Sequence, residues 1–268
     1  MVLQSGVQMP PRNIRGIRQS DEEAGVVGEF EGQVVMVTGG GRGIGRAIVA
    51  MFAGEGAAVH SIDALPQDGP ADDGIHRHLC DISDRVAVNH LFDGLRDAGT
   101  RIDVLVNNAA TVTRAVKITE LSPEEWEKTV SVNITGTFNI SCGAIPLMGP
   151  GGRIINLAST FAHVGSPGRV AYSTTKAAML GFTRSLALDL AENGIRVNSV
   201  SPGGIATDRL IELFGSEQAA TDYLAPLHPI GHTGTPGNIA DAVWFLASQR
   251  SSFMTGADLL VDGGYTAR

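Results

Sequence analysis

A tyrosine and a lysine stand four residues apart in the stretch AYSTTKAAMLGFTRS, at positions 172 and 176, in a chain that contains only three residues of each type. In a helix, that spacing places both side chains on one face. A free phenol, with a pKa of about 10, is a poor base at neutral pH, but a neighbouring ammonium group lowers that pKa. Tyr172 and Lys176 are therefore candidates for proton exchange with an alcohol or carbonyl oxygen, the alternative being an exposed helix pair.

A glycine-rich loop, TGGGRGIG at residues 38–45, follows a short apolar run and begins a helical pattern. Gly39, Gly43 and Gly45 permit a tight turn and a close backbone approach, with Arg42 and Ile44 between them. The free N–H groups at the start of the helix then face the loop, where they suit a pyrophosphate. The loop predicts a dinucleotide-binding site, whereas a glycine-rich run without this context would indicate only a tight turn.

An aspartate, Asp63, ends the second apolar run eighteen residues after the last glycine of the loop. A carboxylate there accepts hydrogen bonds from the adenosine ribose and repels a 2′-phosphate, which favours NAD over NADP. Arg42 favours the opposite choice, because a basic residue in the loop pairs with phosphate. We give Asp63 more weight because Ala64, and not a basic residue, follows it. Asp81, beside Ile82 after the third apolar run, is placed for the adenine edge or for an ordinary turn.

Short β-branched runs alternate with longer amphipathic stretches from residue 34 onward. This order predicts right-handed βαβ units, and most runs are too apolar for strands exposed on one face. The predicted fold is α/β: a single doubly wound Rossmann-type domain of about seven mostly parallel strands with helices on both faces. Ser83, Ser122 and Thr235 mark three helix starts. The predicted strands span 34–38, 58–62, 75–79, 104–107, 153–158, 196–200 and 258–261, and the predicted helices span 43–54, 83–98, 122–145, 172–193 and 236–248.

Two segments depart from this alternation. Residues 1–31 are polar and contain proline, which predicts a flexible or surface-draped extension ahead of one domain at 32–268. Residues 205–235 carry scattered apolar side chains between turn residues, just past the end of a strand. Doubly wound sheets bind ligands at that edge, so we expect a mobile substrate lid there, with a subunit-contact hairpin as the alternative.

The charge balance and the cysteine content limit the kinds of molecule that the protein can bind. A net charge of −8 offers no basic surplus to neutralise phosphates, which argues against nucleic acid and an anionic membrane. Cys80 and Cys142 are the only cysteines, too few for a disulfide framework or a zinc site. The N-terminal stretch has no apolar run typical of a signal peptide or membrane helix. We expect a cytoplasmic protein with a small-molecule substrate and no metal.

Seven short motifs occur in one order along the chain: TGGGRGIG at 38, NNAA at 107, VNITG at 132, Ser159 in NLAST, YSTTK at 172, PGGIAT at 202 and VDGG at 261. In these motifs the chain resembles the short-chain dehydrogenases/reductases, from about residue 31 to the C-terminus. Ser159 precedes Tyr172 by thirteen residues, the separation usual in that family. Ala110 departs from the pattern, since the family usually has glycine there.

This resemblance implies a role for each matched residue. Tyr172 would exchange the proton while hydride passes to or from the nicotinamide. Lys176, together with the positive nicotinamide ring of an oxidised cofactor, would stabilise the Tyr172 phenolate, and Lys176 would also bind the nicotinamide ribose. Ser159 would orient the substrate oxygen, and Asn133 would hold a water that links Lys176 to solvent. The resemblance further implies a homotetramer. Cofactor contacts are also implied at Asn107 and Ala109 on the adenosine side and at Pro202, Gly203, Ile205 and Thr207 near the carboxamide.

We expect an NAD-dependent oxidoreductase that interconverts a secondary alcohol and a ketone in a mainly hydrophobic pocket. The loop after Ser159 offers Thr160, Phe161 and His163 as pocket walls, although a lone loop histidine more often packs or faces solvent. Two other functions remain open. An NADPH-dependent 3-oxoacyl reductase is disfavoured by the acidic residue after the second strand. A non-catalytic NAD-binding scaffold or redox sensor is disfavoured by the complete Ser, Tyr, Lys and Asn set.

Overall fold

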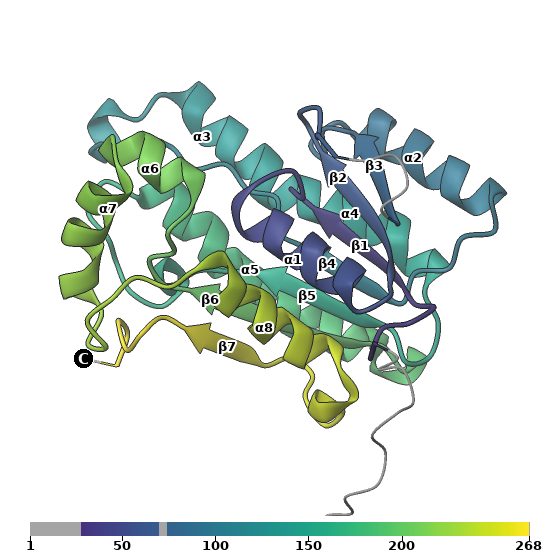
Figure 1. Ribbon diagram of the computed structural model, residues 1–268. Helices are drawn as coiled ribbons and strands as arrows, with labels where there is room; N and C mark the ends of the chain where they lie inside the picture. Colours follow the sequence, from purple (N-terminus) through teal and green to yellow (C-terminus); the bar gives the residue numbers. More distant parts are fainter. Residues whose placement is uncertain (1–27, 70–73, 268) are drawn as a thin grey trace, which may run out of the picture.

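A parallel β-sheet forms the centre of the molecule (Figure 1). The computed structural model describes residues 28–69 and 74–267, and within them seven strands pair in the order β3-β2-β1-β4-β5-β6-β7. The chain reverses its direction of travel across the sheet between β1 and β4, which opens a crevice at the carboxyl ends of these strands. The doubly wound prediction is confirmed. The strands are β1 (Val34–Thr38), β2 (Ala58–Asp63), β3 (Ile75–Leu79), β4 (Val104–Asn107), β5 (Arg153–Leu157), β6 (Arg196–Pro202) and β7 (Asp258–Val261).

Helices cover both faces of the sheet, and each layer has its own apolar core (Figure 1). Side chains on β1 alternate between the two cores, so that Val35 and Val37 pack on one face and Met36 on the other. All three are fully buried, as expected for a strand covered on both sides. The first core lies under α1 (Gly43–Gly54) and α8 (Pro236–Ala247), and the second under α2 (Arg85–Asp97), α4 (Thr137–Ala144) and α5 (Val170–Leu190).

Side-chain caps set the starts of several helices. Ser122 and Thr235 each form a capping box, at α3 (Pro123–Val130) and at α8. Asp84 caps α2 in place of the predicted Ser83, and its carboxylate accepts hydrogen bonds from two N–H groups of the first turn. A carboxylate is favoured at that position because it also complements the positive end of the helix dipole.

The packed domain begins before the predicted boundary at residue 32. Residues 1–27 of the predicted extension lie outside the described residues, but Phe30 is fully buried. Its ring meets Phe52 edge to face at 4.8 Å and Trp244 at 6.2 Å between centroids. The Arg153 guanidinium lies 5.9 Å from the same ring. Residues 28–31 therefore belong to the domain, because the apolar ring of Phe30 is removed from water there.

The segment predicted as a lid folds into two short helices, α6 (Asp208–Phe214) and α7 (Glu217–Leu224) (Figure 1). The rings of Phe214 and Tyr223 join them, with centroids 5.1 Å apart. An exposed ion pair of 3.8 Å between Arg46 and Asp208 links α6 to α1. Shorter helical turns complete the chain at η1 (Ile118–Glu120), η2 (Ser131–Gly136), η3 (Ile145–Leu147), η4 (Thr160–Ala162), η5 (Ala191–Asn193), η6 (Ala225–Leu227) and η7 (Gln249–Ser251).

Candidate active site

The glycine-rich loop turns at the carboxyl end of β1, where the end of β4 holds its backbone. The Asn108 amide nitrogen Nδ2 donates to the carbonyl oxygens of Thr38 (2.9 Å) and Gly39 (3.0 Å). In return, Thr38 Oγ1 accepts from the backbone N–H groups of Asn108 and Ala109, both at 3.0 Å. Gly39 has a φ of 66°, which favours glycine. Sequence reasoning had not singled out Asn108, although the doubled asparagine of NNAA was its signal.

This loop leaves the N-terminus of α1 open to an anion. A Cβ on Gly45 would lie 1.9 Å from the Gly39 carbonyl oxygen, so only glycine fits this approach. Arg42 is the N-cap residue, yet its side chain makes no capping hydrogen bond, and the first turn carries no acidic side chain. Within residues 28–69 and 74–267, the first N–H groups of α1 therefore have no side-chain partner, and the helix dipole favours a negative charge there. These residues fit the pyrophosphate of a dinucleotide.

Asp63 lies beside the loop at the end of β2. Its Oδ2 accepts from the Gly41 N–H at 3.0 Å, and its Oδ1 accepts from the Leu65 N–H at 3.1 Å. The residue is only half-buried, and each carboxylate oxygen accepts more than one hydrogen bond. Asp63 therefore has acceptor capacity left for a ligand. Arg42, by comparison, is exposed.

The carboxyl end of β5 and the first turns of α5 bring Ser159, Tyr172 and Lys176 together. Lys176 is 4% exposed, and its Nζ donates to the Leu157 carbonyl oxygen at 2.6 Å. The same nitrogen lies 5.7 Å from the centroid of the Tyr172 ring, so the pair does share a face. Ser159 is buried, and its side chain accepts from the Phe161 N–H at 3.2 Å. Its hydroxyl also acts on the Tyr172 phenol and lowers the pKa of that group. Ser159 thus both caps a turn and influences the phenol.

Burial dominates the electrostatics of this group. It raises the pKa of the Tyr172 phenol above its ordinary value and lowers the pKa of Lys176 to about 8. The hydrogen bond with Ser159 and the charges of Arg209 and Arg169 act to lower the pKa of Tyr172, but desolvation outweighs them. The expected lowering of this pKa by Lys176 together with the positive nicotinamide ring of an oxidised cofactor concerns the cofactor-bound protein, and it stays a prediction. Sequence reasoning also missed both arginines.

Asn133 lies in a π-helical turn, η2, which interrupts the helix predicted over residues 122–145. Its Nδ2 donates to the Thr111 carbonyl oxygen (2.9 Å) and to Thr175 Oγ1 (3.0 Å), and its Oδ1 accepts from the Thr111 N–H (2.7 Å). The side chain therefore ties the loop after β4 to α5, one residue before Lys176. Such turns are frequent at functional sites because they redirect a side chain without ending the helix.

Three residues predicted to bind the cofactor have partners within the fold. Asp81 Oδ1 accepts from the backbone N–H (2.9 Å) and the hydroxyl (2.7 Å) of Ser83, as in the ordinary turn that was the alternative, while its contact with the adenine edge stays a prediction. Ile82 is buried in the core shared with α2 and α4. Asn107 Nδ2 donates to Asn156 Oδ1 at 2.9 Å and joins β4 to β5. In the part of the chain that the structure describes, Asn107 Oδ1 is buried without a hydrogen-bond partner.

The motif PGGIAT, which begins at the last residue of β6, places some of its residues at the crevice and others in the core. Pro202 ends the strand, and Gly203 follows it. Ile205 is 6% exposed and packs in the core under α1 and α8, so its side chain does not face the crevice. Thr207, the N-cap residue of α6, makes no capping hydrogen bond with its side chain. Its methyl carbon would lie 3.5 Å from a Cβ on Gly43, so Thr207 opposes the glycine-rich loop.

The loop after Ser159 places its candidate pocket walls differently. The Phe161 ring meets the Tyr172 ring edge to face, with centroids 6.4 Å apart. His163 turns away, and its Nε2 lies 2.9 Å from Asp258 Oδ2 on β7. Thr160 is buried. Of these three residues, Phe161 is therefore the one that borders the Tyr172 ring.

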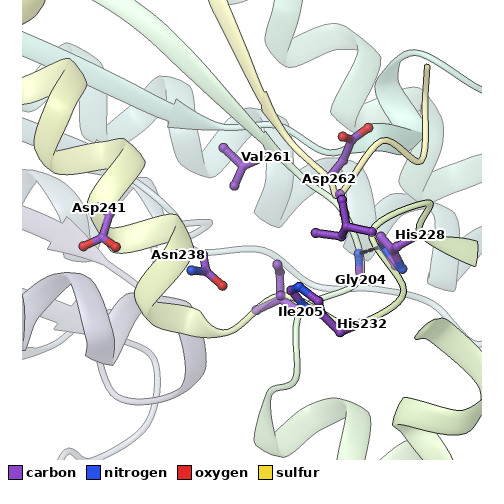
Figure 2. Close-up of a pocket in the computed structure, with 12 residues that line it drawn as sticks. Gly204, Ile205, His228, His232, Asn238, Asp241, Val261 and Asp262 are labelled. Carbon is purple, nitrogen blue, oxygen red and sulfur yellow. Dashed lines mark hydrogen bonds between the residues drawn. The ribbon is translucent and has the colours of Figure 1, made fainter.

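A separate cavity of about 280 Å³ lies between the carboxyl end of β6, the loop before α8, and α8 itself. Figure 2 shows Asn238 and Asp241 of α8 on one side of it and His228 and Asp262 on the other. The His228 imidazole is committed to the fold, since its Nε2 accepts from a backbone N–H at 2.9 Å. Gly203 and Ile205 line this cavity, but Ser159, Tyr172 and Lys176 do not, so it lies apart from these three side chains.

Proteins of known family match most of the chain. A family model described as enoyl-(acyl carrier protein) reductase matches residues 39–266. The 3-oxoacyl-(acyl-carrier-protein) reductase of Thermotoga maritima is 34% identical over 245 residues, which cover 88% of this chain and 98% of that protein. The chain belongs to the short-chain dehydrogenase/reductase family.

A solved structure and a longer relative agree with this placement. The ligand-free aldohexose dehydrogenase of Thermoplasma acidophilum has a TM-score of 0.84 at 34% identity, covering 90% of this chain and 96% of that one. An uncharacterized short-chain type dehydrogenase/reductase of Sinorhizobium fredii is 37% identical over 240 residues, and these cover 87% of this chain but only 44% of that protein.

As a short-chain dehydrogenase/reductase, the chain is an oxidoreductase with a Rossmann nucleotide-binding fold, and the family uses NAD or NADP. A small-molecule substrate is consistent with this class. Among residues 28–69 and 74–267, no helix combines the length and the apolar character needed to cross a membrane.

Proposed function

We propose that this short-chain dehydrogenase/reductase interconverts a secondary alcohol and a ketone with NAD, and that Tyr172 exchanges the proton with the substrate oxygen. The convergence of Ser159, Tyr172 and Lys176 carries this proposal, at the edge of the sheet where the glycine-rich loop also turns. The names of two relatives, a 3-oxoacyl reductase and an aldohexose dehydrogenase, describe conversions between alcohols and carbonyl compounds. They support the same class of reaction here.

The reaction follows from the chemistry of each side chain. The bound nicotinamide supplies or accepts the hydride. In reduction, the Tyr172 phenol, kept protonated by burial, donates its proton to the carbonyl oxygen; in oxidation, the phenolate removes the proton of the alcohol. Ser159 holds the substrate oxygen beside the phenol through its hydroxyl. The charge of Lys176 stabilises the phenolate, and Phe161 shields one edge of the Tyr172 ring.

Asp63 supports NAD as the preferred cofactor. Its half-buried carboxylate next to the Gly41 N–H offers acceptors to ribose hydroxyls and repels a 2′-phosphate. The alternative, an NADPH-dependent 3-oxoacyl reductase, is favoured by the similarity to the Thermotoga maritima enzyme and by Arg42. Fluorescence titration of the purified protein with NADH and NADPH separates the two proposals. Tighter binding of NADPH than of NADH would reject the NAD assignment.

Replacement of Tyr172 tests the mechanism directly. Tyr172→Phe keeps the ring against Phe161 and removes the hydroxyl. On a panel of secondary alcohols with NAD at alkaline pH, we expect kcat to fall by about 10²–10⁴-fold, the usual contribution of a proton-transfer group. NADH affinity should change by less than about threefold, since the phenol does not contribute to the pyrophosphate site. Equal turnover by both proteins removes Tyr172 from the mechanism. Absence of turnover with any alcohol favours a non-catalytic NAD-binding scaffold.

The lid and the oligomer belong to the same proposal. Residues 205–235 would act as a substrate lid, because α6 is linked to α1 beside the glycine-rich loop and places Arg209 near Tyr172. A homotetramer would cover apolar side chains that remain exposed on α4 and α5, such as Phe138 (43%) and Leu188 (77%). A monomeric mass by size-exclusion chromatography with light scattering would contradict the tetramer.

A further inference from the structure

Two guanidinium groups act electrostatically on the Tyr172 phenol without being part of the Ser159, Tyr172 and Lys176 group. Arg169 is the N-cap residue of α5, and Arg209 is the second residue of α6. The Arg169 Nη1 donates to the Thr113 carbonyl oxygen at 2.8 Å, and the Arg209 Nη2 donates to the Val112 carbonyl oxygen at 3.4 Å. Two arginines from different helices therefore converge on consecutive residues of one short loop after β4.

Both guanidinium charges change the pKa values of the proposed proton-transfer group. Each of them lowers the pKa of Tyr172, and the charge of Arg209 also lowers the pKa of Lys176. Burial, followed by the nearby charges of Arg42 and Arg169, lowers the pKa of Arg209 itself, while Tyr172 and Glu212 act in the opposite direction. Positive charge is thus concentrated at the phenol in a protein whose net charge is −8.

This positive charge is not neutralised within the fold. Across the described ranges 28–69 and 74–267, neither Arg169 nor Arg209 forms an ion pair with a carboxylate. Glu212, the acidic group that acts on Arg209, is exposed. Both arginines are half-buried, and the carbonyl bonds use only some of the five N–H donors of each guanidinium. A partly desolvated cation with free donors is stabilised when an anion binds to it.

We propose that Arg169 and Arg209 bind an anionic group of the substrate, so that the enzyme acts on a hydroxy acid or a phosphorylated hydroxy compound in preference to a neutral alcohol. This inference rests on the proposed function, because it takes Tyr172 as the group that meets the substrate oxygen. A planar guanidinium fork matches a carboxylate or phosphate in a way that an apolar wall does not. The substrate site is then more polar than the sequence predicted, with Phe161 as its apolar side.

Matched anionic and neutral substrates test the selectivity. We would compare kcat/KM for 3-hydroxybutyrate and its methyl ester, and for glycerol 3-phosphate and glycerol. The wild type should prefer the anionic member of one pair, and which pair shows the preference identifies carboxylate or phosphate. Arg169→Gln and Arg209→Gln should each lower kcat/KM for that anion by about 10–100-fold, mainly through KM, as expected for a lost hydrogen bond to a charged group. Arg169→Lys should recover part of the loss.

A matched control variant removes an arginine far from the site. Arg101 is exposed at the amino end of β4, the opposite edge of the sheet, and Arg101→Gln should leave the preference for the anion unchanged. Thermal melting of each variant establishes that it folds. If the wild type turns over the neutral member of both pairs as well as the anionic one, the proposal is wrong. It is also wrong for Arg209 if Arg209→Gln weakens NADH binding and lowers both activities equally, since Arg209 then serves the cofactor.

A binding measurement separates this inference from the proposed function. Malonate, a dianion with no hydroxyl to oxidise, should raise the melting temperature of the protein–NADH complex more than the neutral malonamide does. Arg169→Gln and Arg209→Gln should abolish that difference. If malonate shows this pattern but no alcohol is turned over, the anion site stands and the proposed catalysis fails. If malonate and malonamide act alike on the wild type, the anion site is rejected even when alcohols are oxidised.

Discussion

Adding a methyl group at Gly45 tests how far the shape of the glycine-rich loop depends on its closest contact. A Cβ there would lie 1.9 Å from the Gly39 carbonyl oxygen and 2.6 Å from Asn108 Nδ2, where real contacts stay above 3.0 Å. The loop must therefore move by about 1 Å, which disturbs both hydrogen bonds from Asn108. Overpacking costs about 1–3 kcal/mol and a lost hydrogen bond about 1 kcal/mol. We expect Gly45→Ala to lower the free energy of unfolding by about 2–4 kcal/mol.

Gly54, at the end of the same helix, provides a control of opposite sign. No heavy atom lies within 4 Å of its added Cβ, and its φ is not in the left-handed region. Gly54→Ala should therefore raise the free energy of unfolding by about 0.5–1 kcal/mol through the reduced entropy of the unfolded chain. Urea unfolding followed by tryptophan fluorescence measures both variants.

Cofactor affinity supplies the second measurement on the same pair. The dissociation constant for NADH should rise by about tenfold or more in Gly45→Ala, because the displaced loop keeps a pyrophosphate away from the N-terminus of α1. In Gly54→Ala it should stay at the wild-type value. Wild-type stability together with wild-type NADH affinity in Gly45→Ala would refute the reasoning, since the loop would then tolerate a contact that the structure excludes.

Two further predictions concern buried titratable groups. Burial lowers the pKa of His60, which shares a hydrogen bond with His78, to about 4, so the protein should lose up to about 3 kcal/mol of stability between pH 6.5 and 4. Urea unfolding of His60→Asn should show a shallower acid slope than the wild type, and an identical slope would contradict the assignment. Burial lowers the pKa of Lys176 from 10.5 to about 8, which means that the buried ammonium group destabilises the folded protein at pH 7. Lys176→Met should therefore raise the free energy of unfolding at pH 7 by about 1–3 kcal/mol, although the variant loses activity. This gain should shrink between pH 8 and 10.5, where Lys176 of the folded wild type is no longer charged. Replacement of the exposed Lys128 by Met should give no such gain in the same measurement. If Lys176→Met is less stable than the wild type, the hydrogen bond from Lys176 to the Leu157 carbonyl oxygen outweighs the desolvation of the ammonium group.

Local patterns made the sheet and the cofactor loop predictable. Each strand was predicted within two residues of its bounds. The central strands, such as β1 and β4, are short apolar runs because burial on both faces demands that composition. The positions of the glycine-rich loop and of Asp63 were equally predictable from the sequence, since both depend on a single βαβ unit. Asp81 was ambiguous in sequence, because a carboxylate after a strand suits a turn as well as a ligand.

Features that depend on distant parts of the chain were not predictable. Phe30 looks like part of a polar extension until α8 brings Trp244 to its ring. Arg169 and Arg209 are forty residues apart in sequence and meet at one loop only because α6 folds over the edge of the sheet. No local pattern marks such a pair. The rise of the Tyr172 pKa on burial was not predictable for the same reason, since the extent of desolvation depends on all the elements around the phenol.

The π-helical turn η2 joins α3 to α4 and sets how far α4 is rotated about the helix axis relative to α3. An α-helix turns by about 100° per residue, so one surplus residue rotates everything beyond it by that angle. Removing any single residue from 131–136 would restore regular α-helical bonding, yet it would also swing the buried Ile140 and Ala144 of α4 out of their core. The number of residues in 131–136 is therefore more tightly constrained than the identity of most of its side chains. That number fixes both the position of Asn133 and the face that α4 turns toward the core.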